Sequence, residues 1–193
     1  MNDEVSSWKR LIARAVKGGP REARYMQLAT VDATGKPHNR TVVFRGFLPG
    51  TDRPTFTTDA RSQKIDQITK DPRAELCWYF ATVRQQFRLS GSLKLVGPQH
   101  RYEAYQRARE VVWARLSEGI RRRFAWPHPL RPRSDASEYD VDVPGPGRPL
   151  ANFRLVIMDV SDVDHLNLAT DPHQRTLYTR RRGGDWVRHE VNP

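Results

Sequence analysis

The sequence predicts a mainly β fold (α+β) in which six to eight strands form one closed or split β-barrel with flanking helices. Short apolar runs separated by turn residues fill most of the chain. Helical periodicity is limited to three segments. The length of 193 residues suffices for one domain with a core and is short for two. We therefore expect a single domain over residues 1–193.

Three segments carry the expected helices. Residues 6–17 place apolar side chains at helical spacing, with Ser6 or Ser7 as the candidate cap. A short helix over 62–70 ends before an Asp-Pro pair, because the residue before proline disfavours the helical conformation. From about 98 to 123 the apolar positions again follow a helical period.

The other apolar runs are typical of strands. A hairpin turn is expected around Gly35 and another turn at Gly183-Gly184, and Gly91 is expected to bend its strand. The expected strands cover residues 25–32, 37–45, 54–58, 74–80, 85–96, 152–160, 163–168, 175–178 and 186–191.

Residues 126–150 form a separate feature, an irregular segment rich in proline and glycine. A loop of that length inside one domain is usually functional or disordered. The chain that follows it is too short to fold alone. We therefore expect a lid or a segment that wraps a partner, and not a linker between domains.

The net charge of +11 favours anionic partners but does not decide between the classes of anion. It fits a nucleic acid, an anionic membrane surface or a phosphorylated ligand, and equally an arginine-rich solvated surface. The arginine runs 121–123 and 180–182 lack the interleaved aromatic residues that single-strand binders use. We expect a small-molecule substrate and no nucleic acid partner.

Several chemistries are excluded by residue type. Cys77 is the single cysteine, so neither an internal disulfide nor a cysteine-based zinc site can form. The histidines show no metal-ligand spacing, so we expect no metal. No apolar stretch approaches the roughly 20 residues of a membrane-spanning helix. These features favour a cytoplasmic protein without a membrane partner.

The most informative region lies between residues 40 and 91, where cations and hydroxyls flank apolar strands. The strand 40–45 begins and ends on arginine. It is either an edge strand whose charges discourage aggregation or a strand along which a cofactor lies. Ser62, Gln63 and Lys64 open a short helix with a hydroxyl, an amide and an ammonium group, which suits a phosphate.

Four motifs occur in one order along the chain. They are Arg40-Thr41-Val42-Val43-Phe44-Arg45, then Thr57-Thr58 with Ser62-Gln63-Lys64, then Gln85-Gln86-Phe87-Arg88-Leu89-Ser90-Gly91, and finally His173-Gln174-Arg175-Thr176-Leu177-Tyr178. As a set, they resemble the FMN-binding split-barrel family of pyridoxamine 5′-phosphate oxidase. The resemblance covers most of the chain.

The resemblance implies FMN as the cofactor and a homodimer with FMN at the subunit interface. Arg40 and Lys64 would contact the FMN phosphate beside the Ser62 hydroxyl. Gln86 and Arg175 would bond the polar edge of the flavin from the partner subunit. The implied cofactor-binding residues are Arg40, Thr41, Val42, Val43, Thr57, Thr58, Ser62, Gln63, Lys64, Gln86 and Arg175.

On the substrate side, the resemblance implies that Arg45 and His173 face a small substrate. His173 is equally compatible with a solvated loop. If the family reaction is retained, pyridoxamine or pyridoxine 5′-phosphate transfers a hydride to flavin N5, and no catalytic side chain is assigned. The alternative is an FMN-binding protein without oxidase turnover, such as a carrier, sensor or regulator.

The chain also departs from the family pattern. Gln63 stands where the family has a phosphate-binding arginine, for which Arg61 is the candidate replacement. Leu166 lies nearest to the place of a flavin-stacking tryptophan, and Asp171 replaces an arginine near His173. The family's substrate-phosphate signature is absent. The natural substrate and the redox partner, oxygen or a nicotinamide, therefore remain open.

Overall fold

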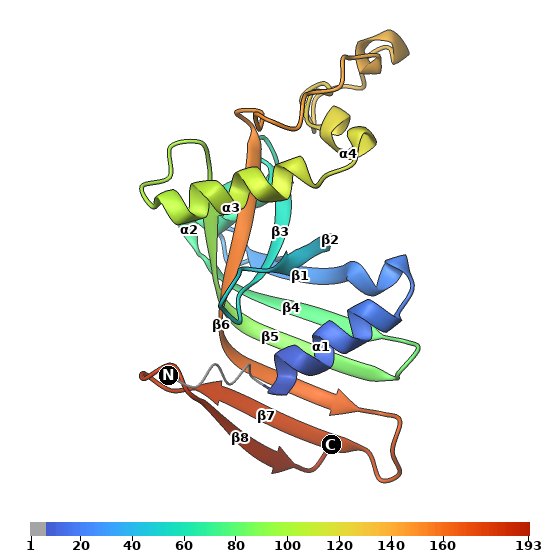
Figure 1. Ribbon diagram of the computed structural model, residues 1–193, viewed down its shortest axis with the longest axis vertical. Helices are drawn as coiled ribbons and strands as arrows, with labels where there is room; N and C mark the ends of the chain where they lie inside the picture. Colours follow the sequence, from blue (N-terminus) through green and yellow to red (C-terminus); the bar gives the residue numbers. More distant parts are fainter. Residues whose placement is uncertain (1–6) are drawn as a thin grey trace.

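The computed structural model describes residues 7–193, and its centre is one antiparallel sheet of eight strands (Figure 1). The strand order is β3-β2-β1-β4-β5-β6-β7-β8, and a further pairing of β3 with β6 closes the first six strands into a barrel. The prediction of a mainly β split barrel is confirmed. The strands are Tyr25–Val31 (β1), Pro37–Phe47 (β2), Pro54–Asp59 (β3), Arg73–Phe80 (β4), Gln85–Val96 (β5), Phe153–Asn167 (β6), Gln174–Arg180 (β7) and Trp186–Val191 (β8).

The longest strand, β6, links the barrel to the two extra strands. Its first half pairs with β3 and its second half pairs with β7. The sequence predicted two strands here, and that prediction is wrong. Ser161 is an extra residue between the pairs Ser90–Asp162 and Gly91–Val160, so the expected turn is a bulge. A Cβ on Gly91 would lie 2.2 Å from the Asp159 carbonyl oxygen, so this close approach requires glycine.

The barrel core is rich in aromatic side chains and is covered at one side by α1 (Ser7–Gly18). Trp8 and Ile12 of that helix are fully buried, as the helical spacing predicts. The Trp8 ring packs edge-on against Phe47 and Trp186. The candidate cap Ser6 lies outside the described residues. A 3₁₀ turn, η1 (Arg21–Arg24), leads from α1 into β1.

The remaining helices lie toward the end of the barrel opposite β7 and β8 (Figure 1). They are α2 (Lys64–Lys70), α3 (Glu103–Ala114) and α4 (Glu118–Arg123). The sequence predicted one helix from 98 to 123, but the extended backbone of Ser117 separates α3 from α4. Between them Leu116 is buried with Trp113 and Phe153 in a second core, so packing determines the break. In residues 7–193 no helix is long and apolar enough to span a membrane.

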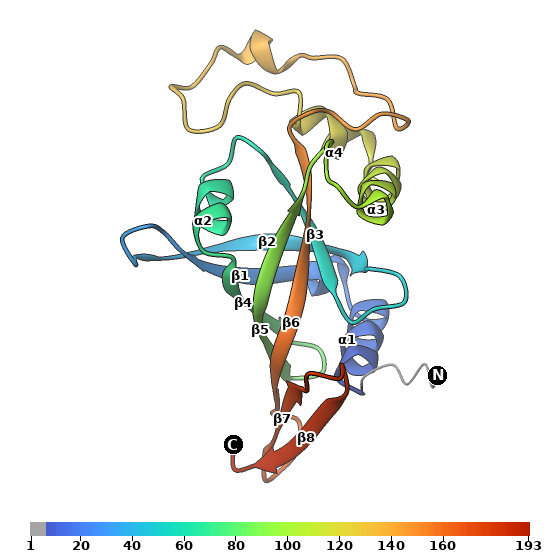
Figure 2. The same cartoon turned by 90° about the vertical axis from the view of Figure 1, so that its left-hand side faces the viewer.

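After α4, the proline-rich segment runs back to β6 with only a short 3₁₀ turn, η2 (Ala136–Tyr139). Figure 2 shows it arching over the end of the barrel, from the side of α3 and α4 to the space above α2. Residues 126–150 are thus an irregular excursion between α4 and β6. The single domain stays a prediction. The position over α2 matters for the site described next.

Candidate functional site

Two cations without a carboxylate partner meet beneath α2, and we call Arg40 and Lys64 the cation cluster. Arg40 lies on β2, where it alternates with the buried Val42 and Phe44 and so points to the inner side of the sheet. Lys64 is the first residue of α2, and its ammonium donates hydrogen bonds to the hydroxyls of Thr58 (3.1 Å) and Ser62. Within residues 7–193 neither cation forms an ion pair, although most other half-buried arginines of the sheet do.

A buried glutamine holds Arg40 in place. The Gln67 side chain is 5% exposed, and its Oε1 accepts hydrogen bonds from Arg40 Nη2 (2.7 Å) and from the Thr30 hydroxyl (2.7 Å). Arg40 Nη1 donates to the same hydroxyl and to the Leu28 carbonyl (3.3 Å). Sequence reasoning missed Gln67. The signal was its place in the short helix, one turn after Lys64 and next to the inward Ile68.

The cation cluster keeps hydrogen-bond donors for a ligand. A guanidinium has five N–H donors, and Arg40 gives three of them to Leu28, Thr30 and Gln67. An ammonium has three donors, and Lys64 gives two to Thr58 and Ser62. Three N–H donors on two neighbouring cations are therefore left for an acceptor, which is the donor set that a phosphate dianion needs. The residues present fit the FMN phosphate.

The electrostatics of the cluster also favour an anion. Burial lowers the pKa of Arg40. Burial, and next the charge of Arg40, lower the pKa of Lys64. Both cations are thus less stable here than in water, because they are partly desolvated and repel each other. A bound dianion would relieve both penalties.

Of the other predicted phosphate contacts, two lie beside Lys64 and two point away from it. Thr58 and Ser62 contact Lys64, while Thr57 is one position along β3 and points to the opposite face. The Gln63 side chain is exposed and forms no hydrogen bond. The Ser62 N–H donates to the Asp59 carbonyl, so it is not free for a ligand. Because α2 has only seven residues, its N-terminus contributes little to anion binding. The two cations are therefore the main anion-binding groups of the site.

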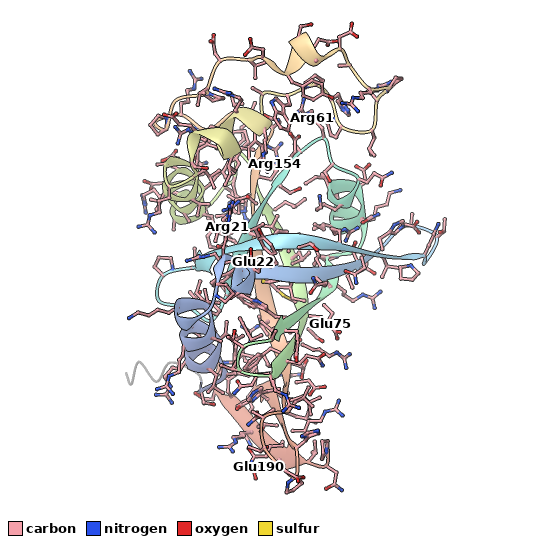
Figure 3. All side chains as sticks on the ribbon, turned by 90° about the vertical axis from the view of Figure 1, so that its right-hand side faces the viewer. Arg21, Glu22, Arg61, Glu75, Arg154 and Glu190 are labelled. Atoms are coloured by element: carbon pink, nitrogen blue, oxygen red, sulfur yellow. The ribbon has the colours of Figure 1, made fainter. Side chains whose placement is uncertain are left out.

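Arg61 does not replace the arginine that is missing at Gln63. It forms an ion pair with Asp59 (2.7 Å) and donates to the carbonyls of Trp126 (3.0 Å) and Phe124 (3.3 Å). Figure 3 shows Arg61 between the end of β3 and the overlying proline-rich segment. Its charge is neutralised by Asp59, and its donors tie the segment to the barrel.

Thr58, Ser62 and Lys64 line a cavity of about 480 Å³ whose other wall is the proline-rich segment. The cavity separates α2 and β3 from residues 126–133. Asp59 is the one acidic residue in its lining, and Arg61 already binds it. The cavity therefore has a positive lining next to the cation cluster.

Gln86 and Arg175 lie on the outer face of the sheet, away from the cation cluster. Gln86 pairs with Leu166, and Leu166 pairs with Arg175, so the three side chains lie in a row across β5, β6 and β7. From β2 to β5 there are three strand spacings of about 4.8 Å each. Arg175 binds Asp164 through two hydrogen bonds (3.0 and 2.6 Å), and this pair raises its pKa. Within one chain the two groups of residues therefore lie on opposite faces of the sheet.

The outer face of β2 carries the other predicted flavin contacts. Thr41 is exposed and Val43 is half-buried there, while Val42 points into the core. Arg45 is the extra residue of a bulge between the pairs Phe44–Phe56 and Gly46–Thr55, and Gly46 adopts a φ of +125°. A bulge re-aims a side chain, so the local backbone sets the direction of Arg45.

The two predicted substrate residues are far apart in the fold. Arg45 lines a cavity of about 400 Å³ beneath α3, and its buried Nε has no hydrogen-bond partner. Burial, and next the charges of Arg24 and Arg21 (Figure 3), lower its pKa. His173 is exposed in the turn between β6 and β7, where its Nδ1 contacts the Thr170 carbonyl oxygen (2.8 Å). Arg45 lies on a barrel strand, whereas the His173 turn follows the second half of β6, which has left β3 and pairs with β7.

Comparisons with known sequences agree with the fold. Residues 5–97 match the family described as pyridoxamine 5′-phosphate oxidase, FMN-binding domain. The chain is 33% identical over 200 residues to pyridoxine/pyridoxamine 5′-phosphate oxidase 2 of Arabidopsis thaliana, and the match covers 100% of both chains. It is 31% identical over 206 residues to pyridoxine/pyridoxamine 5′-phosphate oxidase of Anaeromyxobacter dehalogenans, covering 99% of this chain and 96% of the relative.

Solved structures support the same family and fold. A pyridoxamine 5′-phosphate oxidase-related, FMN binding protein from Nostoc punctiforme is 41% identical with a TM-score of 0.94, over 98% of this chain and 100% of that one. PhzG from Burkholderia lata, at 22% identity and a TM-score of 0.76, covers 96% of this chain and 90% of its own, and shows the shared fold. Fold and relatives define an FMN-binding split-barrel protein. The chain belongs to the pyridoxamine 5′-phosphate oxidase family.

Proposed function

We propose that this protein is an FMN-dependent oxidoreductase that oxidises a small phosphorylated substrate, pyridoxamine or pyridoxine 5′-phosphate. The observation that carries the proposal is the cation cluster, whose two unpaired charges and three free donors fit the FMN phosphate. The names of the relatives from Arabidopsis thaliana and Anaeromyxobacter dehalogenans support the reaction. When bound, FMN supplies a two-electron acceptor for the hydride that leaves the substrate carbon.

In this proposal the chain's own residues bind and orient. Arg40 and Lys64 hold the phosphate, with the hydroxyls of Ser62 and Thr58 beside it, and neither Thr57 nor Gln63 is needed to bind it. The backbone of Thr41, Val42 and Val43 faces the flavin ring. Because Gln67 and Thr30 fix the Arg40 guanidinium, the phosphate is bound at a defined place along β2.

A homodimer completes the site in the same proposal. Gln86 and Arg175 are on the outer face of the sheet and Arg40 points to the inner side, so one flavin cannot contact all three within one chain. A second copy that packs against the outer face brings its own Gln86 and Arg175 to the ring. Leu166, which lies between them, would then pack on the flavin in place of a larger side chain.

The substrate side follows the same logic. The Arg45 guanidinium carries an unpaired charge at the wall of a cavity, so it is suited to the substrate's phosphate. His173 of the second copy would donate a hydrogen bond to the substrate from the opposite side. Within one chain, the polar contact of His173 is the one with the Thr170 carbonyl oxygen in its own turn.

Aerobic incubation of the FMN-loaded protein with pyridoxamine 5′-phosphate tests the reaction. The proposal expects pyridoxal 5′-phosphate and hydrogen peroxide in equal amounts. Flavin that is reduced anaerobically but not reoxidised by oxygen would point to another electron acceptor, such as a nicotinamide. Flavin that stays oxidised in both conditions would contradict the oxidase.

A second candidate function is FMN binding without oxidase turnover, as in a carrier, sensor or regulator. Asp171 favours it, because a carboxylate two residues before His173 would repel a substrate phosphate. Replacing Asp171 with asparagine separates the two functions. The oxidase predicts a lower KM for the phosphorylated substrate in this variant, whereas a pure binding protein shows no turnover before or after the change.

A further inference from the structure

The proline-rich segment over α2 is held firmly at both of its ends. At its start, Arg61 and Asn152 donate to the Phe124 carbonyl, and Asn152 also binds Asp59 (2.7 Å). On its return, Trp113 Nε1 donates to the Gly145 carbonyl (2.9 Å) and Arg121 Nε donates to the Pro144 carbonyl (2.8 Å). Buried side chains therefore fix where the segment leaves and rejoins the barrel.

Between these ends the segment presents arginines to the cation cluster. Arg131 and Arg133 line the same 480 Å³ cavity as Lys64, from the opposite wall, and Arg123 lines it from the end of α4. The aromatic rings of Trp126 and Tyr139 pack edge-on (5.5 Å between centroids) and complete that wall. Among residues 7–193 none of the three arginines forms an ion pair.

The charges on the segment are not arranged to neutralise each other. None of its acidic residues lines the cavity. The one acidic residue in the lining is Asp59, which Arg61 already binds. The segment's own acidic residues are Asp135, Glu138, Asp140 and Asp142. Arginines that face a partly buried lysine across a cavity repel it unless an anion lies between them. A cavity lined in this way attracts an anionic ligand.

We propose that the segment between α4 and β6 is the outer wall of the FMN phosphate site, and that Arg131 and Arg133 bind the phosphate from the side opposite Lys64. This inference rests on the proposed placement of FMN at the cation cluster. The segment would then supply the positive charge that is lacking elsewhere, because Gln63 is uncharged and the charge of Arg61 is neutralised by Asp59. The phosphate would thereby be enclosed by cations from β2, α2 and the segment.

The double variant Arg131→Gln/Arg133→Gln tests the inference, with Arg148→Gln as the matched control. All three arginines are exposed in the same segment, but Arg148 does not line the cavity. Each apoprotein is titrated calorimetrically with FMN and with riboflavin, which has the same ring and no phosphate. We expect the double variant to bind FMN about tenfold to a hundredfold more weakly, with riboflavin affinity unchanged. The control should match the wild type for both ligands.

Three results would overturn the inference in distinguishable ways. Wild-type FMN affinity in the double variant would show that the arginines do not reach the phosphate. An equal loss for FMN and riboflavin would show that the segment acts only by shaping the site. If the wild type itself bound FMN no better than riboflavin, the placement of the phosphate at the cation cluster would fail as well. The single variant Arg131→Gln, with its melting temperature, guards against loss of fold in the double variant.

Discussion

The α2 end of the barrel and the region around Arg45 and His173 differ in how completely one chain builds them. At the α2 end, Arg40, Lys64 and Gln67 converge from two elements, Gln67 binds Arg40, and Lys64 lines the cavity. Arg45 has an unpartnered Nε, and His173 lies in the turn between β6 and β7, outside the closed barrel. In the proposed function, one chain therefore supplies the cofactor phosphate site, whereas the substrate side needs a second copy.

The strongest way to break this comparison is to remove the cation cluster. The double variant Arg40→Gln/Lys64→Met should bind FMN about 3–6 kcal/mol more weakly, because two charge-assisted contacts are lost. Lys64→Met alone should leave the apoprotein as stable as the wild type or more so, since burial and Arg40 lower the pKa of Lys64 and disfavour its charge in the fold. Fluorescence titration with FMN and thermal melting measure the two effects.

Lys70→Met is the control for this prediction. Lys70 lies on the same helix and is exposed, so its loss should change neither FMN affinity nor stability. FMN affinity of the Arg40→Gln/Lys64→Met variant equal to that of Lys70→Met would contradict the assignment of the phosphate site.

A second prediction concerns His165, which is buried on β6 between the two regions and stacks on Phe87. Burial lowers its pKa from 6.5 to about 4. The unfolded chain binds this proton more readily than the folded protein does. The contribution of neutral His165 to the unfolding free energy is therefore fully present above pH 6.5 and declines as the pH falls toward 4, by roughly 3 kcal/mol. His165→Phe should remove this part of the pH dependence. Urea unfolding of both proteins between pH 4.5 and 7.5 measures it.

Equal slopes of unfolding free energy against pH in the two proteins would contradict the prediction. His189→Phe is the matched control, because His189 is exposed on β8. It should retain the wild-type pH dependence.

A third prediction sharpens the role of Gln67. Gln67→Leu leaves the Thr30 hydroxyl and Arg40 Nη2 without their acceptor, which should cost about 1–3 kcal/mol of unfolding free energy. It should also weaken FMN binding more than riboflavin binding, because Arg40 loses its fixed position. Gln67→Glu restores the acceptor and should recover most of the stability. A loss of stability in Gln67→Glu as large as in Gln67→Leu would sink this account.

The smallest effect is expected on the substrate side. Arg45→Met removes a partly buried, unpaired charge and should stabilise the apoprotein by about 1 kcal/mol, with FMN affinity unchanged. In the proposed oxidase it should raise KM for the phosphorylated substrate with a smaller change in kcat. A fall in FMN affinity would mean that Arg45 belongs to the cofactor site and that the comparison between the regions fails.

Local signals predicted most of the fold. Alternation and turn residues located the strands, because a side-chain period of two is visible in sequence. The bulge at Ser161 and the break at Ser117 escaped prediction, since each depends on packing between distant segments. Gly91 must lie against the Asp159 carbonyl, and Leu116 must reach Phe153. Neither contact leaves a local trace.

The site was predictable to the extent that it rests on motifs. The resemblance gave Arg40, Ser62 and Lys64 as phosphate contacts. In the structure, Ser62 and Lys64 line one cavity, and Arg40 lies beside it, bound to Thr30 of the barrel. Gln67 was missed, because a glutamine on a short helix is ordinarily solvated, whereas packing of α2 on β1 and β5 buries this one. The basic wall of the cavity depends on backbone carbonyls that receive donors from Arg121 and Trp113, which no residue pattern reveals.

A crystal structure of the FMN complex tests the central claim most directly. The account predicts the phosphate within about 3 Å of the Arg40 guanidinium and the Lys64 ammonium, with the flavin ring against Gln86 and Arg175 of a second copy. A phosphate bound elsewhere, or a flavin held entirely by one chain, would contradict it.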